Sequence, residues 1–114
     1  MFFVKQYEMS IRKIWGLQFA LDGLKEGREI LRREYDKLNE DLSAAKTAHG
    51  NNEKLADPDK TIREQMERVI ETKSREIEEW KKRIDEADAT NREVQSQVDG
   101  LFEQLPNLEK KIRE

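Results

Sequence analysis

Hydrophobic residues recur at alternating steps of four and three along residues 14–45, with charged or polar residues between them. This seam comprises Ile14, Leu17, Leu21, Leu24, Arg28, Leu31, Tyr35, Leu38, Leu42 and Ala45. Nine of its ten positions are apolar or aromatic, which is typical of the a and d positions of a coiled coil. The pattern predicts a long helix over residues of about 4–48. We expect Gly50 to end it in the left-handed conformation.

The same repeat resumes after the sequence DPDK, where Asp57 is expected to cap a second helix and Pro58 to occupy its first position. The second seam comprises Met66, Ile70, Lys73, Ile77, Trp80, Ile84, Ala87, Asn91, Val94, Val98, Leu101, Leu105, Leu108 and Ile112. Gly100 and Pro106 interrupt it, and proline is unfavourable inside a helix. We therefore predict a helix over about 58–99, followed by a kinked or broken helical segment over about 100–114.

Two heptad helices joined by a short loop, at about 49–57, favour antiparallel packing. We therefore predict an all-α fold: one domain over residues 1–114, an antiparallel coiled-coil helical hairpin that assembles into a dimeric helical bundle. In such a pair an a position lies level with a d position, so paired residue numbers add to a constant. A constant of 108 places hydrophobic positions opposite each other along the whole chain.

The polar positions of the seams acquire partners in this register. Arg28 would lie opposite Trp80 and could stack on its indole, while Tyr35 could cover the methylene stem of Lys73. Asn91 would lie opposite Leu17. A single polar residue at an a position commonly specifies register or oligomeric state.

Further hydrophobic residues gather near the N-terminus, outside the seam. Ile11, Trp15 and Phe19 follow at intervals of four and form a second stripe beside the first. Large apolar patches usually mark contact sites. We expect protein contacts at Phe3, Tyr7, Ile11, Trp15, Phe19, Asn91 and Phe102. The stripe could bind a second copy of the chain, a different protein or a membrane interface. The nearby mixture of acidic and basic residues does not resemble a basic membrane face, so we expect no membrane partner.

Composition narrows the class of protein. Charged residues make up 41% of the chain and hydrophobic ones 35%, which suits a thin coiled-coil core better than a multilayer one. The 22 basic and 25 acidic residues are interspersed, which argues against a nucleic-acid partner. The first residues mix charges into their apolar positions too early for a secretory signal. A cytoplasmic protein is the expectation.

Candidate chemistry is sparse. His49 is the single histidine, is expected in the loop, and has no cysteine or second histidine with which to hold a metal. The carboxylates lie on two solvated helices, where no buried pocket would shift their pKa values. We therefore expect no enzyme, no cofactor and no metal.

The favoured interpretation is a structural scaffold or adaptor that self-associates through the aromatic stripe. The alternatives are a regulatory inhibitor and a chaperone or escort-like hairpin that binds a different protein through the same apolar end. The length and helix–turn–helix plan resemble those of prefoldin subunits, although the pair of strands between the helices has no counterpart in this sequence.

Overall fold

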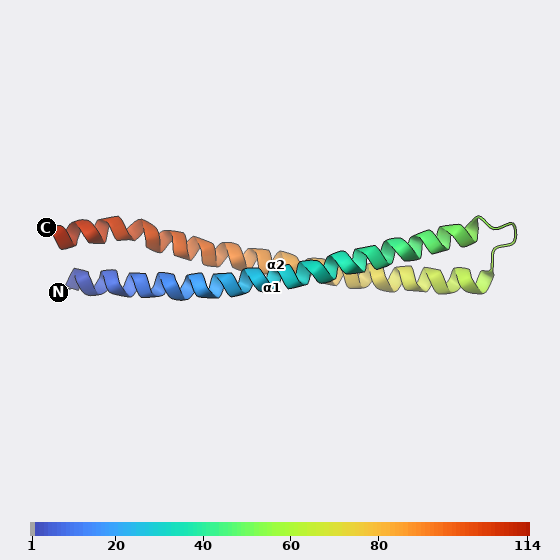
Figure 1. The fold of residues 1–114 in the computed structure, drawn as a ribbon, viewed down its shortest axis with the longest axis horizontal. Helices are drawn as coiled ribbons and strands as arrows, with labels where there is room; N and C mark the ends of the chain where they lie inside the picture. Colours follow the sequence, from blue (N-terminus) through green and yellow to red (C-terminus); the bar gives the residue numbers. More distant parts are fainter. Residues whose placement is uncertain (1) are drawn as a thin grey trace. The chain divides into compact units, whose positions relative to one another are not determined.

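The protein is an all-α helical hairpin. The computed structural model describes residues 2–114, in which α1 spans Phe2–Glu53 and α2 spans Lys60–Arg113. The two helices run antiparallel (Figure 1), and residues 2–114 contain no strand. The predicted all-α helical hairpin is confirmed. None of the helices described is long and apolar enough to cross a membrane.

The hairpin divides into two compact units, each built from both helices. The terminal unit contains the chain up to Arg28 together with Glu86–Glu114, and the turn unit contains Glu29–Asp85. Each unit is described by itself below.

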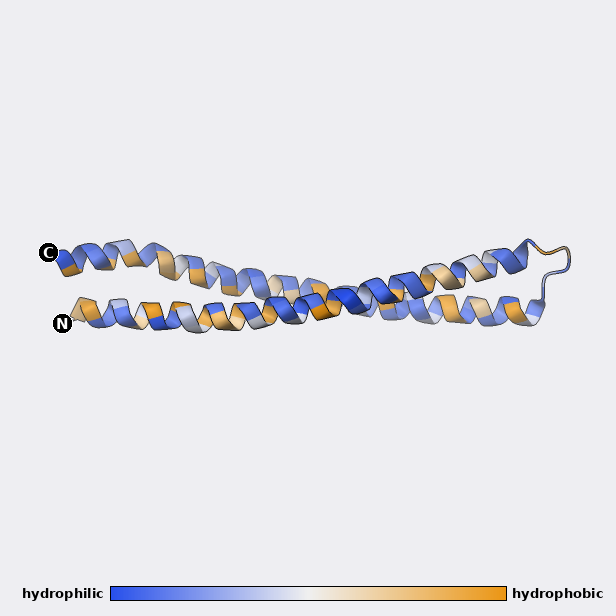
Figure 2. Cartoon of the chain, viewed as in Figure 1, coloured by the Kyte–Doolittle hydropathy of each residue, from blue (hydrophilic) through white to orange (hydrophobic). Residues whose placement is uncertain are grey.

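The predicted seams are the faces that the two helices bury. In the terminal unit Ile14, Leu21, Val98 and Leu105 are buried, and in the turn unit Ala45, Ile77 and Ile84 are buried. Figure 2 shows hydrophobic residues recurring between hydrophilic ones along α1 and α2. Most of the remaining seam positions are partly buried. Two are less covered, since Leu24 is 36% exposed and Ile112 is 40% exposed.

The ends of the helices at the turn differ from the prediction. α1 continues through Gly50 to Glu53, and no glycine of residues 2–114 has a positive φ, so the expected helix end at Gly50 is wrong. The cap of α2 is Asp59 rather than Asp57. The Ile62 N–H donates to Asp59 Oδ1 at 3.1 Å, and the Arg63 N–H donates to the Asp59 carbonyl at 2.9 Å. These are the bonds of an N-cap residue, and they place Pro58 before the cap.

The register of the two helices is shifted by one heptad from the predicted one. Tyr7 contacts Glu109 and Arg28 contacts Asp88 in the terminal unit, and the two residue numbers add to 116 in each pair. In the turn unit Arg63 contacts Glu53, which gives the same total. The constant of 108 is therefore wrong by about seven. The cause is the turn, which is centred several residues later than expected because α1 is longer and α2 begins later.

α2 passes through Gly100 and Pro106 without a break, so the expected break is wrong, and the kink that was its alternative stays a prediction. Proline removes one backbone hydrogen bond and leaves the carbonyl of residue 102 without its helical partner. Pro106 lies on the exposed side of α2, where water can bind that carbonyl. Leu105 is buried and Leu108 is partly buried, so packing on both sides of the proline holds the helix in place.

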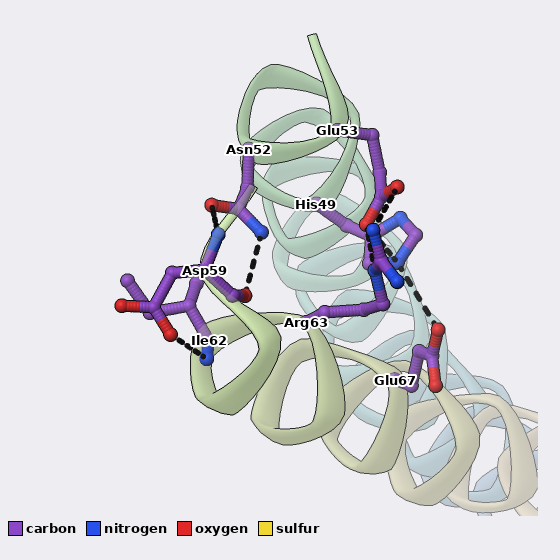
Figure 3. Close-up of polar contacts among 7 residues, drawn as sticks. All are labelled: His49, Asn52, Glu53, Asp59, Ile62, Arg63 and Glu67. Atoms are coloured by element: carbon purple, nitrogen blue, oxygen red, sulfur yellow. Dashed lines mark hydrogen bonds and ion pairs between the residues drawn. The ribbon is translucent and has the colours of Figure 1, made fainter. Parts of the chain in front are cut away.

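Polar contacts fasten the two helices together at the turn (Figure 3). Asn52 is 7% exposed, and its Nδ2 donates to the Asp59 carbonyl at 3.2 Å while its Oδ1 accepts from the Asp59 N–H at 3.4 Å. Arg63 Nη2 donates to Glu53 Oε2 at 3.0 Å, and this hydrogen bond with the Glu53 charge raises the pKa of Arg63. Asn52 thereby ties the last turn of α1 to the first residue before α2.

His49 lies within α1 and not in the loop, so that part of the prediction is wrong. Its Nε2 is 3.5 Å from Glu67 Oε1 and 3.9 Å from Glu53 Oε1. Figure 3 shows it beside Arg63 and the two carboxylates. His49 is thus one more side chain at which α1 and α2 meet near the turn.

The polar seam positions of the turn unit have other partners than predicted. Lys73 Nζ lies 3.9 Å from Asp41 Oδ2, and the ring of Tyr35 is covered by Arg32, at 5.5 Å from the ring centroid. Arg83 lies over the ring of Trp80 at 5.0 Å. The contacts of Arg32 and Arg83 each join residues three apart in one helix, whereas the contact of Lys73 with Asp41 follows from the shifted register.

Candidate protein-interaction surface

The core of the terminal unit is one layer thick. Ile14, Val98 and Leu105 are buried together, and Tyr7, Ile11, Leu17 and Leu101 pack around them. Two helices can bury only the residues that face each other along the seam. A large hydrophobic residue that points away from the partner helix therefore stays on the surface of this unit.

Two aromatic residues of α1 are the most prominent of these. Trp15 is 69% exposed and Phe19 is 84% exposed. They stand one and five residues after buried Ile14, at heptad positions b and f, which point away from the partner helix. Covering such a side chain is worth about 2 kcal/mol, so their exposure is unfavourable for an isolated hairpin.

Phe102 of α2 lies on the same side of the seam as Ile11. Both occupy e positions, and the e positions of two antiparallel helices share one flank. The contacts of Tyr7 with Glu109 and of Arg28 with Asp88 also reach e positions of α2. Phe102 is 47% exposed. On α1, Ile11, Trp15 and Phe19 run from this side of the seam to the outer face of the helix, and we call these three residues and Phe102 the aromatic flank.

Tyr7 is a link between the helices rather than a free contact residue. Its side chain is partly buried against the core, and its hydroxyl donates to Glu109 Oε1 at 3.1 Å. This hydrogen bond is the main reason that the pKa of Tyr7 is raised, and burial and the Glu109 charge add to it. Tyr7 thereby fixes the end of α2 against α1.

Phe3 belongs to a small cluster at the start of α1. Its ring meets that of Phe2 edge to face, with centroids 5.4 Å apart, and Lys111 Nζ lies 5.2 Å from the Phe3 centroid. Phe2 remains 69% exposed. The cluster adds exposed apolar surface at the start of α1.

Asn91 is placed differently from the expectation. The register puts it level with residue 24 instead of residue 17, one heptad further from Trp15. Its Oδ1 is buried and has no hydrogen-bond partner among residues 2–114. A buried oxygen without a partner is destabilising. Because Asn91 is now further from Trp15, its predicted role in protein contacts stays a prediction.

A groove on the opposite flank was not predicted. It is a hollow of about 380 Å³, lined on α1 by residues that include Gln6 and Lys13 and on α2 by residues that include Gln104 and Lys111. These four are g positions, which share the other flank of an antiparallel pair. The sequence signal is the run of uncharged g positions at Gln97 and Gln104 within a highly charged helix. We call this hollow the basic groove.

Among residues 2–114, no group of three or more His, Cys, Asp or Glu side chains could hold a metal ion. Comparison with protein-family models, curated proteins and solved structures finds no match to this chain. The candidate functional features are the two surfaces of the terminal unit, the aromatic flank and the basic groove.

Proposed function

We propose that this protein is a non-enzymatic coiled-coil interaction protein, a structural scaffold or adaptor, that self-associates through the aromatic flank. The observation that carries the proposal is the exposure of three aromatic side chains in the terminal unit, Trp15, Phe19 and Phe102. A hairpin that left three aromatic side chains in water would forgo several kcal/mol of burial, at about 2 kcal/mol for each.

A second copy is a suitable partner because the flank can pack against itself. Homo-oligomers most often adopt two-fold symmetry, in which the same patch of both subunits meets. Two hairpins arranged in this way form a four-helix bundle, and each aromatic flank becomes part of a shared core. The charges beside the flank include both signs, with Glu8 and Arg12 one turn apart, so they can pair across such an axis.

Light scattering on wild-type protein and on the double variant Trp15→Glu with Phe19→Glu tests the proposal. We expect the wild type to have the mass of a dimer or larger assembly at micromolar concentration and the variant to have the mass of one chain. The matched control is Ile30→Glu with Leu55→Glu, which removes two residues of the turn unit with 56% and 57% exposure. The control should keep the wild-type mass.

A monomeric wild type would contradict self-association. It would favour the alternative, in which the same flank binds a different protein, as in a regulatory inhibitor or a chaperone or escort-like hairpin. Loss of mass in the control as well as in the flank variant would show that any added charge dissociates the assembly. The aromatic flank would then have no special role.

A further inference from the structure

The hollow of about 380 Å³ is one part of the basic groove, which also includes a second hollow. A second hollow of about 340 Å³ shares Lys13 and Gln104 with the first and continues it along both helices. Its floor includes Leu17 and Leu101, which are partly buried. The two hollows together run from residue 97 to residue 111 of α2, a length of about 21 Å at 1.5 Å per residue.

The charge of the groove differs from that of the chain. Twelve residues line the two hollows, and the two charged ones, Lys13 and Lys111, are both basic. The whole chain is 41% charged and carries a net charge of −3. Depletion of charge is typical of the centre of a protein interface. A groove whose remaining charges are all positive favours an acidic partner.

The shape of the groove suits a helix. Its walls include Gly100, which has no side chain, and the amides of Gln97 and Gln104. A groove between two helices with an apolar floor and polar edges is a common site for an amphipathic helix. Lys111 lies beside Phe3 of α1. Phe3 precedes Lys13 by ten residues, which is about 15 Å along the helix, so the two lysines stand about 15 Å apart along the groove.

We propose that the basic groove binds an amphipathic α-helix of a partner protein, with leucine-like residues on the floor and acidic residues at its edges that pair with Lys13 and Lys111. The two lysines belong to different helices, so the acidic residues lie at opposite edges of the partner's apolar stripe, two to three turns apart. This site lies on the g flank. It does not require self-association through the aromatic flank.

Titration calorimetry with a designed peptide tests the site. The probe is a three-heptad helical peptide with leucine at a and d and glutamate at e and g, and its counterpart has lysine at e and g. We expect the glutamate peptide to bind wild type at least tenfold more tightly than the lysine peptide. Lys13→Glu with Lys111→Glu should weaken the glutamate peptide at least tenfold and strengthen the lysine peptide.

The control is Lys81→Glu with Lys82→Glu, which makes the same change of charge on exposed residues of the turn unit and should leave both affinities unchanged. Equal binding of the two peptides, or glutamate-peptide affinity that survives the groove variant, would overturn the proposal. So would loss of assembly mass in the groove variant, because a second copy would then occupy the groove. Trp15→Glu with Phe19→Glu should keep peptide binding, so the two proposals fail separately.

Discussion

Two polar side chains at the terminal core show how a one-layer core accommodates them. Tyr7 rests its ring on hydrophobic neighbours and sends its hydroxyl outward to Glu109. Asn91 is shorter, and its Oδ1 is buried with no partner among residues 2–114. The difference lies in reach, since a tyrosine hydroxyl extends past the seam to the e position of the other helix. A polar group at a narrow seam is therefore satisfied when its side chain can cross the seam.

Tyr7 should ionise at a higher pH in the folded protein than in the unfolded chain. The Glu109 hydrogen bond holds its proton and raises its pKa. The link therefore stabilises the fold up to the ordinary pKa of tyrosine and is lost as the pH rises through the raised pKa. Tyrosinate absorbance near 295 nm in a Tyr35→Phe background measures this titration, with the urea-unfolded protein as reference.

Glu109→Gln supplies the control for Tyr7. It removes the negative charge but keeps an acceptor, so the titration should move back toward that of the unfolded chain without returning fully. A folded protein in which Tyr7 titrates together with the unfolded chain would show that Tyr7 and Glu109 are not bonded in solution.

At the scale of the element, a heptad repeat predicts which face of each helix is buried but leaves the register between the two helices ambiguous. The hydrophobic repeat marks the buried face of each helix, and burial of Ile14, Leu21 and Val98 follows it. A repeat of seven cannot distinguish one register from another shifted by seven residues, because the hydrophobic positions stay opposite each other in both. The choice is made at the turn, where Asn52 bonds Asp59 and Arg63 bonds Glu53. Those contacts depend on where the helices end.

The helix ends themselves were mispredicted because local signals compete. Gly50 and Asp57 are suitable residues for a helix end and a cap. The structure uses Asp59 as the cap, which also accepts a hydrogen bond from the buried Asn52 side chain through its carbonyl. Tertiary contacts across the turn therefore override the local preference. A single sequence does not display them.

The substitution Gly50→Ala distinguishes a helical Gly50 from a left-handed helix end at Gly50, because the change in stability has opposite signs in the two cases. Gly50 is helical, and an added Cβ would meet no atom within 4 Å, so alanine should raise the free energy of unfolding by about 0.5–1 kcal/mol. At a left-handed helix end alanine would destabilise instead. Urea unfolding measures the change. Gly27→Ala, in the middle of α1 and equally open, should shift stability in the same direction.

At the scale of the whole molecule, the sequence predicted one flank of the terminal unit and missed the other. The aromatic flank is visible in the sequence because Trp15 and Phe19 are conspicuous and lie off the seam. The basic groove depends on residues of both helices, namely the uncharged Gln97 and Gln104 of α2 and the nearby Lys13 of α1. Recognising the groove requires knowing which residues of α1 face which residues of α2, and the predicted register differs from the observed one by one heptad.

Engineered disulfides can measure that register in each unit, and the chain has no cysteine to interfere. Leu17→Cys with Val98→Cys in the terminal unit, and Leu38→Cys with Ile77→Cys in the turn unit, match the observed register, whose contact pairs add to 114–116. We expect both to form disulfides within one chain, detected as a shift in non-reducing gel mobility at unchanged mass.

The matched pairs Leu17→Cys with Asn91→Cys and Leu38→Cys with Ile70→Cys correspond to a total of 108. A shift of seven residues displaces one helix past the other by about 10 Å, and a disulfide needs Cα atoms within about 7 Å. These pairs should therefore stay reduced within a chain under mild oxidation. Efficient crosslinking of these pairs, and not of the pairs that match the observed register, would show that the register with a total of 108 is correct. It would also separate the facing residues that form the basic groove, so the proposed helix-binding site would be lost with the observed register.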